Sequence, residues 1–245
     1  MAFDTLQAAI NEVKTDNVPK TIILEKDISE KITIAKSQNI VFDLQNYKIL
    51  NNGNNAVITN NGTLAISNGT VESDVEYATI NNNTGAILRV SGGNIISKGT
   101  RGAIYNKGGT VEISGSAYLS STATGKPENA TFDRATINNL EQGKLTITGG
   151  TIIGVNQEAV SNDSTSTLII GVKDGNINTS SPVIIGNRYG MENTGTFNYY
   201  DGIIKGITGT ISGTITETET NGQRITGTET TDGKTYVTEY LSITE

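Results

Sequence analysis

The chain has 245 residues and a net charge of −7, with 28 glycines and no cysteine, histidine or tryptophan. Its length allows a substantial core, while the missing cysteine and histidine remove disulfides, thiolate nucleophiles and the commonest transition-metal ligands. Nucleic acid requires a basic surface, which this balance does not provide. Frequent glycine and sparse aromatics favour an all-β protein of short strands and tight polar turns, for which we expect no metal and no cofactor.

The first 19 residues are expected to form a lead-in with a short capping helix. In DTLQAAINEV, Asp4 and Gln7 stand at capping-box spacing. The apolar residues of one helical face are Leu6, Ala9, Ile10 and Val13. This helix would lie over the first coil of the domain that follows, where unpaired strand edges need a cover. The segment lacks a basic region followed by an apolar run, so we interpret the chain as a domain of a longer protein with an added start Met.

Residues 20–209 repeat a unit of about 23 residues, each with three short strands and three turns. The units begin near Lys20, Asn39, Gly62, Gly85, Gly109, Gly143, Ser166 and Gly195. One such unit is one coil of a solenoid, and neighbouring coils must stack to bury their apolar edges. The sequence therefore predicts a right-handed, single-stranded parallel β-helix of about eight coils.

Two apolar columns follow from the alternation of apolar and variable residues in the first and second strands of each unit. The first is predicted to stack Phe42, Leu64, Leu88, Val111, Leu145, Leu168 and Phe197. The second is predicted to stack Val71, Ile95, Ile152, Ile177 and Ile204. Outward residues of the first strands would include Asp43, Ala65, Arg89 and Glu112, and Arg89 and Glu112 on adjacent coils should form an ion pair.

An asparagine recurs in the third strand of successive units, two residues after an aliphatic residue or methionine. Asparagine tolerates turn dihedrals, and stacked amides can hydrogen-bond along the axis of a solenoid. We predict a structural ladder of Asn60, Asn82, Asn106, Asn139, Asn162 and Asn193.

Several phrases resemble right-handed parallel β-helices of the pectate-lyase-like superfamily, and more closely the repeat modules of large Gram-positive surface proteins. They are TIILEKDI, NIVFDLQNYKI, GKLTITGGTI, TLIIGVKDGNINTSSPVIIG and YGMENTGTFNYYDGIIKG, and the resemblance covers about residues 20–205. The resemblance implies the fold, but that superfamily includes lyases, hydrolases, adhesins and phage tailspikes, so it does not imply one activity.

Two coils are longer than the rest, and both insertions are predicted at the corner between the second and third strands. The insertions are residues 120–134 and 179–188, with the short corner 155–158 of the sixth coil between them. The predicted groove would carry Lys126, Asp133, Arg134, Asn156, Gln157, Arg188 and Tyr189. The groove is a candidate ligand site, and the alternative is two tolerated surface loops.

In residues 210–245 the 23-residue repeat ends, and threonine alternates with glutamate or isoleucine. Asn221-Gly222 and Asp232-Gly233 are hairpin signals, which predict a C-terminal antiparallel ribbon that caps the last coil or leads to a further module.

Three functions fit these observations. The favoured one is a non-catalytic bacterial surface module, a structural stalk or adhesin with weak binding of a glycan or of a host or cell-surface protein. We expect it outside the cell, as part of a larger protein, with no membrane insertion by this segment. The alternatives are a carbohydrate-active enzyme (a polysaccharide lyase or glycoside hydrolase), which clustered acids would favour, and a phage tail fibre or spike, which trimerisation would favour.

Overall fold

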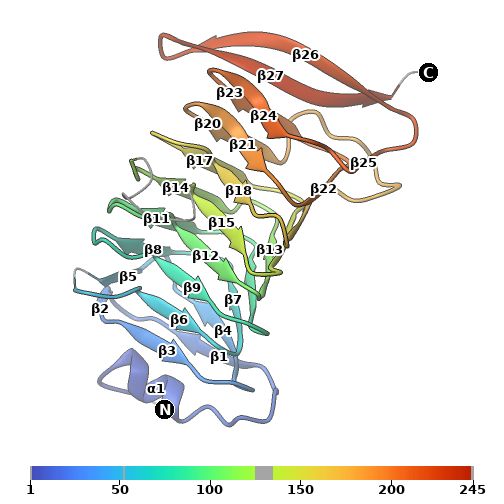
Figure 1. Cartoon of the computed structure of the whole chain (residues 1–245). Coiled ribbons are helices and arrows are strands. Elements are labelled where there is room, and N and C mark those ends of the chain that lie inside the picture. Colours follow the sequence, from blue (N-terminus) through green and yellow to red (C-terminus); the bar gives the residue numbers. More distant parts are fainter. Residues whose placement is uncertain (1, 52, 125–134, 244–245) are drawn as a thin grey trace.

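The computed structural model describes residues 2–51, 53–124 and 135–243. The chain winds through three sheets in turn, so that each strand up to β22 pairs with the strand three positions later in the chain. Figure 1 shows the resulting stack, with the N-terminus at one end and a hairpin at the other. The predicted all-β parallel β-helix is confirmed, and strands β1 to β24 make eight coils.

The first sheet contains one strand from each coil and a short ninth strand. Its members are β1 (Lys20–Ile23), β4 (Asn39–Asp43), β7 (Thr63–Ile66), β10 (Ile87–Val90), β13 (Thr110–Ile113), β16 (Lys144–Ile147), β19 (Thr167–Ile170), β22 (Thr196–Tyr199) and β25 (Glu217–Thr218).

The second sheet ends in the antiparallel ribbon. Its members are β2 (Ile28–Ser29), β5 (Lys48–Asn51), β8 (Thr70–Ser73), β11 (Asn94–Ser97), β14 (Tyr118–Ser121), β17 (Thr151–Gly154), β20 (Val183–Gly186), β23 (Ile203–Gly206), β27 (Lys234–Ile243) and β26 (Gly222–Thr231). The third sheet contains β3 (Ile32–Ile34), β6 (Ile58–Asn60), β9 (Ile80–Asn82), β12 (Ile104–Lys107), β15 (Ile137–Leu140), β18 (Val160–Asn162), β21 (Tyr189–Asn193) and β24 (Gly209–Gly213).

The core consists of inward columns that run along the axis of the stack. From Leu64 to Phe197 the first predicted column is confirmed, because these residues are successive register partners and are fully buried. Its start is wrong: Ile40 lies beside Leu64, and Phe42 lies beside Ile66. Both Ile40 and Phe42 point inward, and a shift of two residues leaves the alternation of faces unchanged, so the pattern could not separate the two registers.

The same shift corrects the outward positions at this end of the first sheet. Val41, and not Asp43, is the register partner of Ala65. Asp43 instead accepts a hydrogen bond from Asn68 Nδ2 at 2.6 Å, and Asn68 and then Gln45 lower the pKa of its carboxyl. The predicted Arg89–Glu112 ion pair is confirmed, with 2.8 Å between Arg89 Nε and Glu112 Oε2.

The asparagine ladder is confirmed along its whole predicted length. Each Nδ2 donates to the Oδ1 of the asparagine one coil further on, over 2.8 Å between Asn60 and Asn82 and between Asn82 and Asn106, and over 2.7 Å at the three later steps. All six side chains are buried. The amides of Asn60, Asn82 and Asn139 also donate to the carbonyls of Ile87, Thr110 and Thr167, the first residues of β10, β13 and β19, so the ladder satisfies polar groups that the core could not leave unpaired.

The N-terminal end is covered by α1 (Leu6–Asn11). The apolar face of the helix is buried as predicted, but the N-cap is Thr5, whose hydroxyl accepts from Ala8 N, and not Asp4. The side-chain amide of Gln7 hydrogen-bonds to the backbone of Thr33 as a neighbouring strand would. Its Oε1 accepts from Thr33 N at 2.7 Å and its Nε2 donates to Thr33 O at 3.2 Å. The helix therefore closes part of the open edge of β3.

The predicted C-terminal ribbon is confirmed as the hairpin of β26 and β27, with β27 antiparallel to β23. The turn is at Asp232-Gly233, whose φ angles of 51° and 74° suit a two-residue hairpin turn. Asn221-Gly222 is not a hairpin turn, since it leads from β25, a parallel strand of the first sheet, into β26.

A polar network ties the hairpin to the last coil. The buried carboxylate of Glu239 accepts from Thr210 Oγ1 at 2.8 Å and from Arg224 Nε at 2.7 Å. Tyr199 OH lies 2.8 Å from Gly202 O, and burial raises the pKa of this phenol far above its usual value. These contacts fix the direction in which the second sheet continues beyond the eighth coil.

Candidate functional site

Part of the predicted groove does come together in the fold. Asn156 and Gln157 lie in the turn from β17 to β18, and Arg188 and Tyr189 lie in and just after the turn from β20 to β21. The two turns occupy the same corner, between the second and third sheets, on consecutive coils, and Asn187 N donates to Gln157 O at 2.9 Å. We call these four residues with Glu158 the corner site. Lys126, Asp133 and Arg134 lie outside the described residues.

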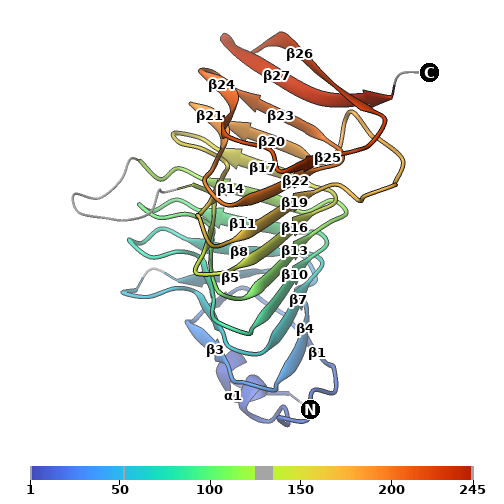
Figure 2. The same ribbon diagram turned by 45° about the vertical axis from the view of Figure 1, so that its right-hand side comes forward.

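The second predicted insertion is at a different corner. β20 is Val183–Gly186, and Ile184 is the register partner of Ile152, so Ile184 takes the place predicted for Ile177. The extra residues of the seventh coil are therefore 171–182, between the first and second sheets, whereas the fifth coil lengthens after β14. In Figure 2 the connection from β19 to β20 is the yellow-orange loop that projects at the right-hand side. The prediction that both insertions project from one corner is therefore wrong. The sequence offers two isoleucines for the second strand of this coil, Ile177 in NIN and Ile184 in PVIIG, and choosing Ile177 placed the extra residues after the strand and not before it.

Glu158 was not among the predicted groove residues, yet it is buried in the corner site and forms an ion pair with Arg188. Its side chain is 1% exposed, and its Oε1 lies 3.6 Å from the Nε of Arg188, whose side chain is 56% exposed. Oε2 of Glu158 has no hydrogen-bond partner within the part of the chain that the structure describes. A glutamate in a polar turn gives no sequence signal of burial, so only the packing of the corner could show it. The arrangement holds a positively charged donor toward solvent, with an acceptor behind it.

Asn156 has a structural role in the same corner. Its Nδ2 donates to Thr122 O at 2.6 Å, which ties the turn of the sixth coil to the coil below it. The Asn156 side chain therefore has part of its hydrogen-bonding capacity already used. Gln157 and Tyr189 are half-buried, and Arg188 is the exposed member of the predicted set.

An apolar strip adjoins the corner site on the outer face of the second sheet. Ile153 and Ile185 are register partners that point outward, two residues or fewer from the turns of the corner, and both are half-buried. Val183 and Ile203 are neighbouring outward residues of the same sheet, and Tyr118, which is 37% exposed, lies beyond Thr151 in the same row. An apolar floor beside a cluster of polar donors and acceptors is the chemistry with which proteins bind amphipathic ligands such as sugars.

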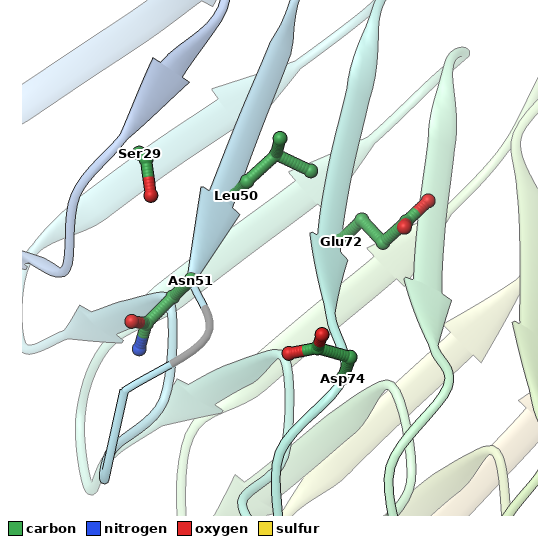
Figure 3. A pocket seen from close by; sticks show the side chains of 5 residues that line it. All are labelled: Ser29, Leu50, Asn51, Glu72 and Asp74. Carbon is green, nitrogen blue, oxygen red and sulfur yellow. The ribbon is translucent and has the colours of Figure 1, made fainter.

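A hollow on the same sheet near the N-terminal end is a weaker candidate. It has a volume of about 190 Å³ and is lined by Ser29, Leu50, Asn51, Glu72 and Asp74, as Figure 3 shows. Small-molecule sites usually enclose 300–1,000 Å³. Glu72 is paired with Lys98, and Asn51 hydrogen-bonds to Asn55 O at 2.9 Å, so two of its polar groups already have partners. Among the described residues, no group of three acidic side chains is placed to hold a metal ion.

Several charged side chains elsewhere on the outside form ion pairs that join parts of the fold. Lys173 forms an ion pair with Glu217, which also accepts from Tyr200 OH at 2.8 Å, and Lys173 and then Tyr200 lower the pKa of Glu217. Lys205 binds Glu229 at 2.6 Å across the second sheet. The first contact joins the loop 171–182 to β25, and the second joins the hairpin to the eighth coil. In each of them an acidic side chain is paired with a basic one.

No known protein family, curated protein sequence or solved structure matches the chain. Over the residues that the structure describes, no helix is long and apolar enough to cross a membrane. The described residues therefore form a parallel β-helix in which the corner site adjoins outward isoleucines of the second sheet.

Proposed function

We propose that the chain is a non-catalytic module of a bacterial surface protein, a stalk or adhesin, that binds a glycan weakly at the corner site. The observation that carries the proposal is the exposed guanidinium of Arg188, positioned by the buried Glu158 at the edge of the apolar strip. The guanidinium can donate hydrogen bonds to sugar hydroxyls or to the carboxylates of acidic sugars. Ile153, Ile185 and Tyr118 would contact the apolar face of the same sugar ring.

The scaffold supports a mechanical role for the same module. The core columns and the asparagine ladder run through consecutive coils, so a load along the axis is shared by parallel strand pairs and by a chain of side-chain hydrogen bonds. Eight coils at the ~4.8 Å spacing of paired strands span about 38 Å. A module of this shape holds its corner site away from its attachment point, which suits an extracellular position in a larger protein.

A glycan array followed by calorimetry tests the proposal. Because an open surface removes few groups from water, we expect dissociation constants of about 0.1–1 mM, or roughly 4–5.5 kcal/mol. Arg188→Ala should weaken binding about tenfold, or ~1.4 kcal/mol. Arg89→Ala is the matched control, because Arg89 lies on the first sheet and its side chain is 47% exposed, against 56% for Arg188. This variant should bind like the unmodified protein.

Two outcomes would contradict the proposal. Equal binding by Arg188→Ala and the unmodified protein would show that the corner site is not the ligand site. New reducing or unsaturated ends after incubation with pectins, alginates and other polysaccharides, abolished by changing a single acid, would show that the protein is an enzyme.

A further inference from the structure

The outer edge of β26 is a free sheet edge ten residues long. β26 is the last strand in the order of the second sheet, and in the described part of the chain it pairs only with β27. It lies at the C-terminal extremity of the stack, beyond the eighth coil (Figure 1). Except for Gly222 and Ile225, its residues are exposed. It contains no proline or lysine, which natural edge strands often use to prevent pairing with another chain.

The hairpin turn determines which backbone groups face outward. Thr231 and Lys234 flank a two-residue turn, and such flanking residues hydrogen-bond to each other, so the odd-numbered residues of β26 point their N–H and C=O groups at β27. The even-numbered residues therefore point away from β27. Gly222 agrees, because its N–H donates to Glu219 O at 3.0 Å outside the hairpin. The outward backbone groups left for a partner belong to Arg224, Thr226, Thr228 and Thr230.

We propose that the free edge of β26 binds β26 of a second copy of the chain, antiparallel and centred on Gly227, and so joins two molecules through one continuous sheet. The four outward residues lie symmetrically about Gly227. In this register Arg224 faces Thr230 of the second copy and Thr226 faces Thr228 of the second copy. By symmetry four hydrogen-bonded residue pairs form, and at two bonds a pair they give about eight backbone hydrogen bonds. The inference is independent of the proposed function, since the edge and the corner site share no residue.

Charge is compatible with a second copy as the occupant. Arg224 is bound to Glu239 and Glu229 is bound to Lys205 within each molecule, at 2.7 Å and 2.6 Å. The register places Glu229 opposite Ile225 and Arg224 opposite a threonine, so no charge faces a like charge. Each copy still carries a net charge of −7, and this general repulsion is screened by salt. Association should therefore strengthen as ionic strength rises.

A proline substitution tests the edge without breaking the hairpin. Thr226→Pro removes an N–H that faces outward, and proline is tolerated on edge strands when its missing N–H faced solvent. Analytical ultracentrifugation over a concentration series should show a monomer–dimer equilibrium for the unmodified protein and for Thr226→Val, with at least roughly tenfold weaker association for Thr226→Pro. A monomer at every concentration, or a trimer, would overturn the proposal.

Disulfide trapping tests the register and does not depend on the proline variant. The chain has no cysteine, so Gly227→Cys introduces a single thiol. At a non-hydrogen-bonded antiparallel pair the two Cα atoms lie about 4.5 Å apart, within disulfide reach. Mild oxidation should give a covalent dimer of Gly227→Cys, and none of Thr231→Cys, whose copies lie roughly 26 Å apart in this register. Equal cross-linking of both variants, or of neither, would overturn the proposal, and capture of a strand from a different protein in place of the second copy would do the same.

Discussion

Removing one rung of the asparagine ladder should cost much more than removing its outward neighbour. Asn82→Ala deletes the donor to Asn106 Oδ1 and the acceptor for Asn60 Nδ2, each at 2.8 Å. Asn60 Nδ2 keeps a bond to Ile87 O at 2.9 Å, but Asn106 Oδ1 is left buried without its donor. A stranded acceptor costs about 1–3 kcal/mol and the lost net hydrogen bond about 1 kcal/mol, so the free energy of unfolding should fall by about 2–4 kcal/mol.

Asn81→Ala is the matched control for this experiment. Asn81 is the adjacent residue of the same strand, has the same side chain and points to the outer face of the third sheet, where it is half-buried. Its substitution should change the free energy of unfolding by about 0.5 kcal/mol or less. Urea unfolding followed by circular dichroism measures both variants. Equal destabilisation by the two substitutions would refute the reasoning, because it would show that the ladder contributes nothing beyond strand propensity.

The remaining predictions concern turns, surface charge and pH. Gly69→Ala should destabilise the protein by several times the ~1 kcal/mol expected for Gly85→Ala. Both glycines have positive φ, but a Cβ at Gly69 would lie 2.3 Å from Leu44 Cβ, whereas a Cβ at Gly85 would meet no atom within 4 Å. Thermal unfolding of the two variants therefore separates the effect of the steric clash from that of backbone strain alone. Arg89→Ala should cost under ~1 kcal/mol in urea, because the Arg89–Glu112 pair is nearly half exposed, and a larger loss would show a role beyond the ion pair. Lys173 and Tyr200 lower the pKa of Glu217, so the folded state binds fewer protons than the unfolded state, and the contribution of Glu217 is complete above its usual value of 4.5 and lost as the pH falls below it. Glu217→Gln should therefore flatten the loss of thermal stability between neutral and acid pH, and an unchanged pH profile would contradict this linkage.

The sequence alone determined which residues face inward, how many coils stack and which asparagines form the ladder. These features depend on local alternation and on a repeat, and both are visible in one chain because each coil must satisfy the same packing rule as its neighbours. The sequence therefore places Leu64, Leu88 and Val111 in one column and Asn82 next to Asn60, and the strand pairing agrees.

Only the tertiary structure decided the register of the first coils, the corner at which the seventh coil is extended, and which strand forms the free edge of the second sheet. A shift of two residues preserves inside and outside, so Ile40 and Phe42 were equivalent by pattern, and contacts with the next coil chose between them. Ile177 and Ile184 were equally plausible strand residues, and pairing with Ile152 selected Ile184, which moved an insertion to another corner. The burial of Glu158 and the outward backbone of Thr226 depend on which segments lie beside them, because a residue's accessibility is a property of its neighbours in space and not of its neighbours in the chain.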